Sequence, residues 1–297
     1  MKSLIQDAIT RRNTLQLSPH HNSFRLIDGF GDRLADLYLD QFSDHWLLSS
    51  KDGMLSEEFV NALKEFEKTI YWKKLDQHEK DSPSLLCGEE VTAPFTGKEN
   101  GLNYELSFQS GYSQGIFLDQ RENRARVNEW CAPNQRILNT FSYTGAFSVA
   151  AASAGATTTT LDLSQPYLEW AKRNMKHNDI SPQDHYFCKG DTFHWLQRFA
   201  KSGRTFHGVI LDPPTFSRDA KGKVFRVEKD YHRLVSLATK VLEPGGWILA
   251  CSNCRKLSEY LFEEQILKGA GTCQLEHFPM PSEYSEEPYL KSTLIRL

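Results

Sequence analysis

The sequence predicts an α/β protein in which a small α+β domain precedes a larger, mostly parallel sheet. From about residue 136, short apolar runs alternate with longer segments of helical periodicity, as in parallel β-α-β units. Earlier in the chain, short alternating runs surround one helical segment. Residues 92–101, rich in turn formers, separate the two patterns. We therefore expect one domain over residues 1–95 and another over residues 96–297.

The first domain should contain two helices and three short strands. Apolar residues near helical spacing predict a helix over residues 1–18. A second helix is expected over 56–68, with Ser56 as its N-cap. The runs that predict strands are 24–27, 36–40 and 45–49.

The second domain should alternate strands with helices and form a doubly wound sheet. Strands are expected at 136–140, 157–162, 185–189, 207–211 and 246–251. Helices are expected at 120–131, 145–154, 164–178, 191–201, 229–242 and 256–268. Two further strands, 272–278 and 289–297, are joined by a proline-containing loop, so the sheet should end in an antiparallel hairpin.

Composition and charge narrow the class of protein. No apolar run approaches the roughly 20 residues of a membrane span, and no signal peptide is evident. The six scattered cysteines indicate reduced thiols, so we expect a cytoplasmic protein without a membrane partner. Residues 1–95 carry 11 Lys and Arg against 16 Asp and Glu, whereas residues 96–297 carry 24 against 22. The C-terminal part is therefore the better candidate for contact with nucleic acid.

Polar groups follow the first three predicted strands of the second domain. The turn after the first strand has a single glycine, Gly145, so the pattern G-x-G-x-x-G of a pyrophosphate-binding loop is absent. Asp162 ends the second strand, where an acid can accept both hydroxyls of a ribose. Asp191 follows the third strand and could bind an adenine amine. These groups suit an adenosine ligand without phosphates, although Asp162 could instead support a helix start at Ser164 and Asp191 could cap the next helix.

A distinctive segment follows the apolar run 208–211. It reads Asp212-Pro213-Pro214-Thr215-Phe216. The acid stands at the carboxyl end of a predicted strand, where open α/β sheets bind ligands. The prolines fix the backbone, and the phenyl ring can stack on a flat base. This arrangement suits methyl transfer to a planar, nitrogen-rich substrate.

Five segments together carry a resemblance to a known family. They are 115–124 (GIFLDQRENR), 139–147 (NTFSYTGAF), 161–174, 212–217 (DPPTFS) and 288–291 (PYLK). With them the chain resembles, over nearly its whole length, the class I S-adenosylmethionine-dependent methyltransferases. The closer likeness is to bacterial 23S rRNA methyltransferases of the 7-methylguanosine type K and 5-methylcytosine type I. The resemblance implies a Rossmann-like sheet, an RNA substrate and a small first domain that helps to position it.

The same resemblance implies S-adenosylmethionine as cofactor and no metal. The residues it places around the cofactor are Phe117, Asp119, Gln120, Asn139, Phe141, Tyr143, Gly145, Asp162, Leu163, Asp191, Thr192 and Asp212. Asn139 stands where the family pattern usually has an acid. For Phe117 and Phe141 the alternative is packing in the core.

The target atom decides which further residues the reaction needs. Carbon 5 of a pyrimidine is unreactive, so a cysteine must first attack the ring. Asn253 stands where the cytosine branch carries that cysteine, and Cys254 lies one position late. The likeness to the 7-methylguanosine branch is closer, and guanine N7 needs no covalent step. We therefore favour methylation at nitrogen, with carbon 5 of cytosine as the alternative.

The resemblance and the local charge together suggest which residues meet the base and the RNA. Residues expected to shape the catalytic site are Asp212, Pro213, Pro214 and Phe216. Residues expected to bind substrate are Arg218, Lys221, Lys223, Arg226, Asn253 and Arg255. Residues 215–240 carry seven Lys and Arg against three acids, with Phe225 and Tyr231 interleaved, which suits RNA phosphates beside a flipped base. The alternative is a solvated loop and helix face.

The sequence is also compatible with other functions. The substrate could be a protein or a small molecule, and a non-catalytic RNA-binding assembly factor could keep the same fold. Such a factor would have no cofactor affinity. A nicotinamide dehydrogenase is disfavoured by the missing glycines. The pair Cys251 and Cys254 has no second pair at ligand spacing, which disfavours zinc.

Overall fold

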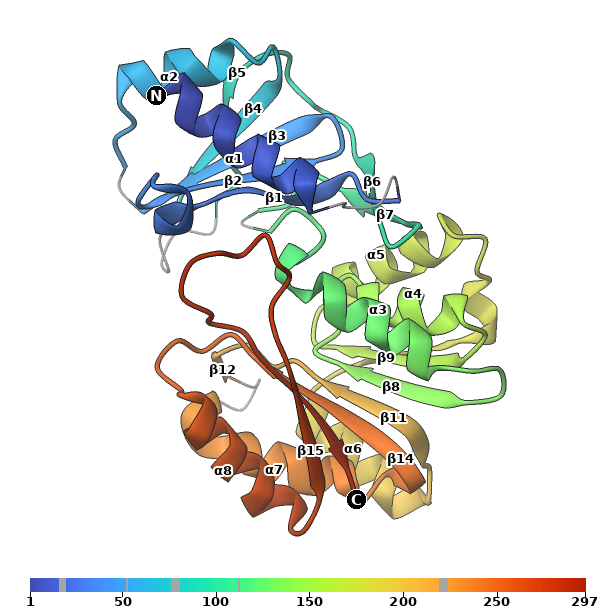
Figure 1. The fold of residues 1–297 in the computed structure, drawn as a ribbon. Helices are drawn as coiled ribbons and strands as arrows, with labels where there is room; N and C mark the ends of the chain where they lie inside the picture. Colours follow the sequence, from blue (N-terminus) through green and yellow to red (C-terminus); the bar gives the residue numbers. More distant parts are fainter. Residues whose placement is uncertain (16–19, 52, 76–80, 112, 219–223) are drawn as a thin grey trace. The chain divides into compact units, whose positions relative to one another are not determined.

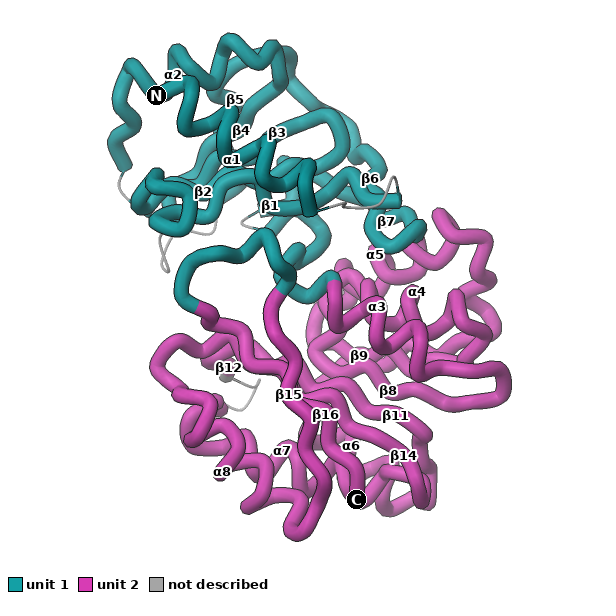
Figure 2. Tube along the Cα trace, in the orientation of Figure 1, with its two compact units in different colours: residues 1–121, 281–287 teal, residues 122–280, 288–297 magenta. Residues whose placement is uncertain are grey.

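The computed structural model describes residues 1–15, 20–51, 53–75, 81–111, 113–218 and 224–297. The chain forms two compact units, coloured separately in Figure 2. Unit 1 comprises Met1–Arg121 with Pro281–Glu287, and unit 2 comprises Glu122–Met280 with Pro288–Leu297. In the described residues, no helix has the length and apolar character needed to cross a membrane.

Unit 1 is built on a five-stranded sheet in the order β1-β2-β3-β4-β5 (Figure 1). The strands are β1 (Ser23–Asp28), β2 (Leu37–Phe42), β3 (His45–Ser50), β4 (Thr69–Lys74) and β5 (Ser84–Cys87). Helix α1 (Lys2–Thr14) and helix α2 (Glu57–Lys64) contribute Ile5, Phe59 and Leu63 to its core. The predicted cap is confirmed, because Ser56 Oγ accepts a hydrogen bond from Phe59 N. Strands β3 and β4 run parallel, with α2 between them in the chain.

Unit 1 extends beyond residue 95, the predicted end of the first domain. Residues 92–101, which the sequence predicts as the boundary, contain the first strand and the turn of a hairpin formed by β6 (Phe95–Glu99) and β7 (Leu102–Leu106). Asn100 and Gly101 make the turn with φ of 51° and 78°. The buried ring of Phe108 then stacks on Tyr71 at 4.2 Å between centroids. The turn composition of residues 92–101 carries no information on such aromatic packing. This explains why the predicted end of the first domain differs from the observed end of unit 1.

The segment 281–287 is attached to unit 1 by charged and polar groups. Both ends of the Glu283 carboxylate accept from the Arg121 guanidinium, and Arg12 Nη2 donates to the Glu283 carbonyl at 2.7 Å. Tyr38 Oη donates to Glu286 at 2.9 Å. Glu283, Arg121 and Arg12 are all buried. Buried charges require partners, so these contacts make the segment an integral part of unit 1.

Unit 2 contains the predicted mostly parallel sheet. Its strands are β8 (Arg136–Thr140), β9 (Thr157–Asp162), β10 (Tyr186–Lys189), β11 (Phe206–Leu211), β14 (Leu242–Ser252), β15 (Gln274–Phe278) and β16 (Lys291–Arg296). The order is β10-β9-β8-β11-β14-β16-β15, and β16 is antiparallel to both its neighbours. The prediction of a parallel sheet closed by an antiparallel hairpin is therefore confirmed.

Helices cover both faces of this sheet (Figure 1). They are α3 (Arg121–Trp130, which begins at the last residue of unit 1), α4 (Ala146–Ser153), α5 (Gln165–Lys176), α6 (Thr192–Ser202), α7 (Val227–Thr239) and α8 (Glu259–Ala270). Alternate strand residues enter two separate cores: Leu138 packs with α6, α7 and α8, whereas Ile137 packs with α3 and α4. Short 3-10 turns also occur at Gly29–Asp32, Leu118–Gln120 and Pro182–Asp184. The small hairpin of β12 (Phe216–Arg218) and β13 (Val224–Arg226) was not predicted.

Candidate active site

The candidate site lies at the carboxyl edge of the parallel strands in unit 2. Thr140 at the end of β8 pairs with Leu161 of β9 and with Leu211 of β11. Leu211 in turn pairs with Ala250 of β14. This register sets the loops that follow these strands at one level, which is where open α/β sheets bind ligands.

The loop after β8 has an unusual backbone. Phe141, Tyr143 and Gly145 have φ of 51°, 50° and 75°. A Cβ at Gly145 would lie 2.5 Å from the Cβ of Ala171, so glycine is needed both for its conformation and for the close approach of α5. For Phe141 and Tyr143, the left-handed conformation costs roughly 1–2 kcal/mol each. Such strain is characteristic of functional sites and persists where surrounding bonds fix the loop.

Asp162 provides one of those bonds. Its Oδ2 accepts from Tyr143 N at 2.9 Å, and its Oδ1 accepts from Ser164 N at 2.8 Å. Burial raises the pKa of Asp162, and the backbone donors act against that shift. Ser164 itself caps α5 by accepting from Tyr167 N. The carboxylate therefore supports the helix start, which was the alternative interpretation, and it keeps acceptor capacity for a ligand hydroxyl.

The other candidates after β8 and β10 differ in their surroundings. Asp191 caps α6, accepting from His194 N at 2.9 Å, and the neighbouring Thr192 is buried. Leu163 is half exposed. Asn139 is buried inside the strand, where its amide donates to Ser148 Oγ at 3.0 Å.

The two candidate phenylalanines are not equivalent. Phe141 is half-buried and packs on Phe225 with ring centroids 6.5 Å apart, which supports its packing alternative. Phe117 is 47% exposed, so it is not a core residue. Phe117, Asp119 and Gln120 all belong to unit 1, whereas the remaining cofactor candidates belong to unit 2.

The segment after β11 displays an acid and a ring. Asp212 is half-buried, Pro213 is buried, and Pro214 is exposed. The Phe216 side chain is 51% exposed at the start of β12. Thr215 Oγ1 donates to Asn253 Oδ1 at 3.2 Å, so this segment is linked to the one that follows β14.

The segment after β14 presents an amide and a cation. Asn253 and Arg255 are exposed, and the Arg255 guanidinium lies 4.4 Å from the Tyr289 ring centroid. Cys251 and Cys254 are 0% and 2% exposed. Cys254 Sγ donates to Glu228 Oε1 at 3.6 Å. All six cysteines are free thiols, and the described residues contain no group of His, Cys, Asp and Glu able to hold a metal ion.

The structure describes part of the basic stretch that follows Phe216. Arg226 is exposed at the end of β13, and Arg218 ends β12. Lys221 and Lys223 lie outside the described residues. Phe225 and Tyr231, which interleave with these cations in the sequence, are both buried in the core beneath α7, so neither ring is available to an RNA base. Burying the apolar surface of these rings stabilises the fold. Helical spacing places Tyr231 on the same inward face of α7 as Leu234 and Val235.

Comparison with known proteins decides the family. Residues 74–293 match the sequence profile of the S-adenosylmethionine-dependent methyltransferases. The chain belongs to this family. A putative methyltransferase solved in complex with SAH superimposes on this methyltransferase with a TM-score of 0.91 and 29% identity, covering 100% of this chain and 80% of that one.

Two relatives carry more specific names. Ribosomal RNA large subunit methyltransferase I of Pseudoalteromonas translucida is 30% identical over 92% of this chain and 74% of its own length. Ribosomal RNA large subunit methyltransferase K of Neisseria meningitidis is 33% identical over 81% of this chain and 69% of its own length. The methyltransferase is thus similar to members of both branches.

The residues present fit the family cofactor. Asp162 holds a carboxylate in a fixed orientation at the end of β9, which suits a ribose diol. The single glycine after β8 approaches α5 closely, and the loop has no multi-glycine cradle for a pyrophosphate. S-adenosylmethionine, an adenosine without phosphates, is compatible with both features.

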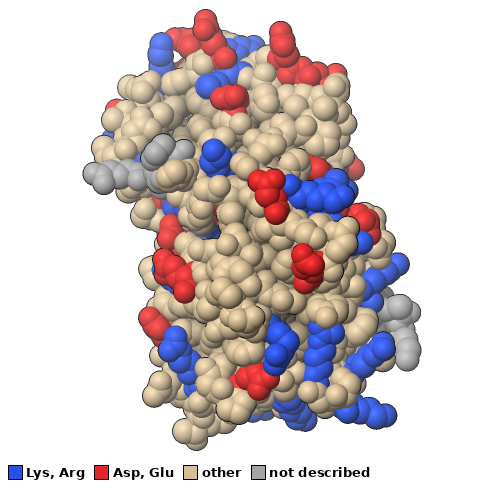
Figure 3. Space-filling view, turned by 90° about the vertical axis from the view of Figure 1, so that its right-hand side faces the viewer, with Lys and Arg blue, Asp and Glu red and all other residues tan. Residues whose placement is uncertain are grey.

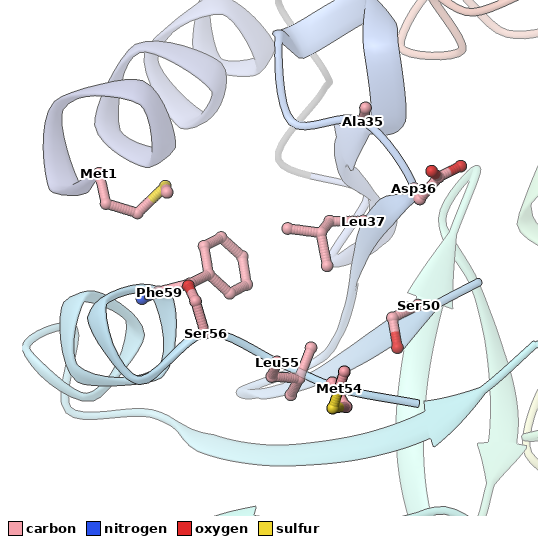
Figure 4. A pocket seen from close by; sticks show the side chains of 9 residues that line it. All are labelled: Met1, Ala35, Asp36, Leu37, Ser50, Met54, Leu55, Ser56 and Phe59. Atoms are coloured by element: carbon pink, nitrogen blue, oxygen red, sulfur yellow. Dashed lines mark hydrogen bonds between the residues drawn. The ribbon is translucent and has the colours of Figure 1, made fainter. Parts of the chain in front are cut away.

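A cavity elsewhere in the protein has a different character. It lies in unit 1, has a volume of about 230 Å³, and is lined mainly by apolar side chains. Met1, Leu37 and Phe59 converge on it (Figure 4). Asp36, on its rim, is paired with Lys51 at 2.7 Å. The chemistry expected of a methyltransferase site is absent from its lining, so we assign the cavity no role.

Proposed function

We propose that this methyltransferase modifies a nitrogen atom of a base in 23S rRNA, with guanine N7 as the favoured target. The names of the two relatives support a large-subunit rRNA substrate. They leave the base open, since the chain is similar to both branches. A cytoplasmic location accords with such a substrate.

The burial of the cysteines is the observation that favours nitrogen. Attack on a pyrimidine ring requires a thiolate that can reach the base. Cys251 and Cys254 are almost fully enclosed, and the Cys254 thiol already donates to Glu228. The exposed side chain at this strand end is that of Asn253, which accepts from Thr215. An amide cannot serve as the nucleophile, but it can hydrogen-bond a base edge.

The residues of the segment after β11 then hold the base. When bound, S-adenosylmethionine supplies an activated methyl group. Asp212 accepts hydrogen bonds from the polar edge of a purine, and Phe216 stacks on its face. Pro213 and Pro214 fix the backbone between these two groups. A nucleophilic nitrogen with a free lone pair needs positioning more than activation, and effective positioning contributes several kcal/mol to such reactions.

The charge of unit 2 supports a polyanionic substrate. On the face of this unit that Figure 3 presents, Lys and Arg side chains gather. Arg226 and Arg255 are exposed on the elements that flank the candidate base site. We assign them, together with Arg218, Lys221 and Lys223, to RNA phosphates. Unit 1, with its acidic balance, is assigned to positioning the RNA rather than to neutralising it.

Transfer of labelled methyl from S-adenosylmethionine to unmodified 23S rRNA tests the proposal, with Asp212→Ala as the control. Nucleoside analysis should recover 7-methylguanosine or another N-methyl base, and the variant should lose the label. Recovery of 5-methylcytidine would overturn the nitrogen assignment. Label in protein or in small molecules, with none in rRNA or ribosomal particles, would overturn the RNA substrate. Failure to bind the cofactor would instead favour a non-catalytic assembly factor.

A further inference from the structure

A buried tyrosine joins the two strands that carry the proposed substrate residues. Tyr231 lies on α7 and is 0% exposed. Its hydroxyl is 3.0 Å from the carbonyl oxygen of Leu211 and 3.1 Å from that of Cys251. These carbonyls belong to the ends of β11 and β14, where the two parallel strands stop pairing.

Both carbonyls lie next to residues that the proposed function assigns to the substrate. Leu211 immediately precedes Asp212, and Cys251 stands two residues before Asn253. The hydroxyl therefore bridges the strands at the point where each passes into a substrate segment. Helix α7 makes a second contact with the segment after β11, where Val227 N at the start of the helix donates to the Thr215 carbonyl at 3.2 Å.

The tyrosine is well suited to a fixed contact of this kind. Its ring packs edge-on against Phe262 at 4.9 Å, within the core formed by α6, α7 and α8. Burial raises the pKa of Tyr231 well above its usual value, and the nearby Cys251 and Asp212 act in the same direction. The hydroxyl thus keeps its single proton and shares it between two acceptors.

We propose that Tyr231 is a positioning residue whose hydroxyl fixes the distance between the ends of β11 and β14 and thereby sets Asp212 against Asn253. This inference rests on the proposed function, since it takes both residues as substrate contacts. Small displacements of positioned groups change rates by about 100-fold. A single buried hydroxyl therefore has a large effect on turnover without touching the substrate.

The variant Tyr231→Phe tests the proposal because it keeps the ring and removes the hydroxyl. The matched control is Val235→Ala, which removes buried volume from the same helix and the same core but has no contact with the strand ends through a polar group. Both variants should lower the melting temperature by a few degrees. Assays are made well below both melting temperatures.

We expect kcat for rRNA methylation to fall roughly 10- to 100-fold in Tyr231→Phe, with KM for rRNA and Kd for the cofactor within about threefold of wild type. Val235→Ala should keep kcat within about threefold. Equal losses of kcat in the two variants would overturn the proposal, as would a cofactor Kd that weakens as much as kcat falls.

Hydrogen exchange separates this proposal from the proposed function. The amides of Asp212, Thr215 and Phe216 should exchange faster in Tyr231→Phe than in Val235→Ala. If the wild type methylates no RNA, the proposed function fails, and exchange alone decides the positioning role. Unchanged exchange at these three amides would overturn it.

Discussion

The two halves of the sheet edge in unit 2 are built differently. At the ends of β9 and β10, the bonds lie among the loops that follow neighbouring strands. Asp162 accepts from Ser164 N two residues on and from Tyr143 N in the loop after β8, and Asp191 accepts from His194 N three residues on. At the ends of β11 and β14, the bonds come from distant elements. Tyr231 reaches both strands, and Lys291 Nζ donates to the Cys254 carbonyl across 37 residues of chain.

Under the proposed function, the two halves bind different ligands, and this accounts for the difference. A small cofactor is bound by a pocket that is largely pre-formed, and short loops that bond to one another provide such a pocket. A base that must be taken out of a folded RNA needs a more open surface, and Phe216 and Asn253 are accordingly exposed. An open surface has few local bonds to fix it, so helices and strands beneath it provide the rigidity. Substitutions in the two halves should therefore affect different measured quantities.

The largest effect is expected at Asp212. Asp212→Asn should lower kcat/KM for rRNA by about 100- to 1,000-fold, because it removes the charged acceptor for the base edge at the reacting centre. The melting temperature should stay within about two degrees of wild type, since the side chain is only half-buried. The matched control is Asp184→Asn, an exposed acid on a 3-10 turn. Activity within about threefold of wild type in Asp212→Asn would contradict the assignment.

Asp162 should affect the cofactor rather than the RNA. Asp162→Asn should weaken cofactor binding by roughly 10- to 100-fold, the equivalent of one charged hydrogen bond, while KM for rRNA stays unchanged. Isothermal titration of wild type and variant would measure this. Equal cofactor affinity in the two proteins would assign Asp162 solely to the turn before α5.

The same residue predicts a pH dependence. Burial raises the pKa of Asp162. On acidification, its carboxylate is therefore protonated at a higher pH than an ordinary aspartate. Cofactor affinity should drop on acidification through that raised pKa and be fully present above it. For folding the sign is opposite: the buried charge disfavours the folded state at neutral pH, and protonation relieves that cost. Asp162→Asn should lack the acid-side drop in affinity.

The contrast also explains what could be predicted from the sequence. Periodicity and strand-end acids depend on neighbouring residues, so the sheet, its closing hairpin and the Ser56 cap were all predicted correctly. The β6–β7 hairpin was missed because its packing involves a distant part of the chain: Phe95 of β6 packs with Phe108, and Phe108 stacks on Tyr71 of β4. The burial of Tyr231 was not predicted either, since the sequence showed only that it interleaves with the cations of residues 215–240. Its helical spacing with Leu234 and Val235 was the available signal, but its hydrogen bonds to two strand ends were not encoded locally.

Phe216 tests the exposed character of the substrate half. Phe216→Leu keeps apolar bulk and removes the flat ring, so it should lose the stacking energy of about 1–3 kcal/mol per base. That corresponds to roughly 5- to 150-fold in kcat/KM for rRNA, with cofactor Kd unchanged. Phe30→Leu, at a phenylalanine that is 76% exposed in unit 1, is the comparison. Similar losses in the two variants would show that exposed rings contribute only nonspecifically.

The smallest effect is expected at Cys254, and it distinguishes the two chemistries most directly. If the target is nitrogen, Cys254→Ser should keep kcat within about threefold, because serine fits the same space and can still donate to Glu228. If the target is carbon 5 of cytosine, the thiol is the nucleophile, and the loss should exceed about a thousandfold. Cys131→Ser, at a buried cysteine that follows α3, controls for placing a hydroxyl in the core. A protein–RNA adduct that survives denaturation of the wild type, together with an inactive Cys254→Ser, would mean that the segment after β14 opens far enough to expose the thiol. The long-range bonds of the substrate half, rather than its exposed residues, would then be the elements that change during the reaction.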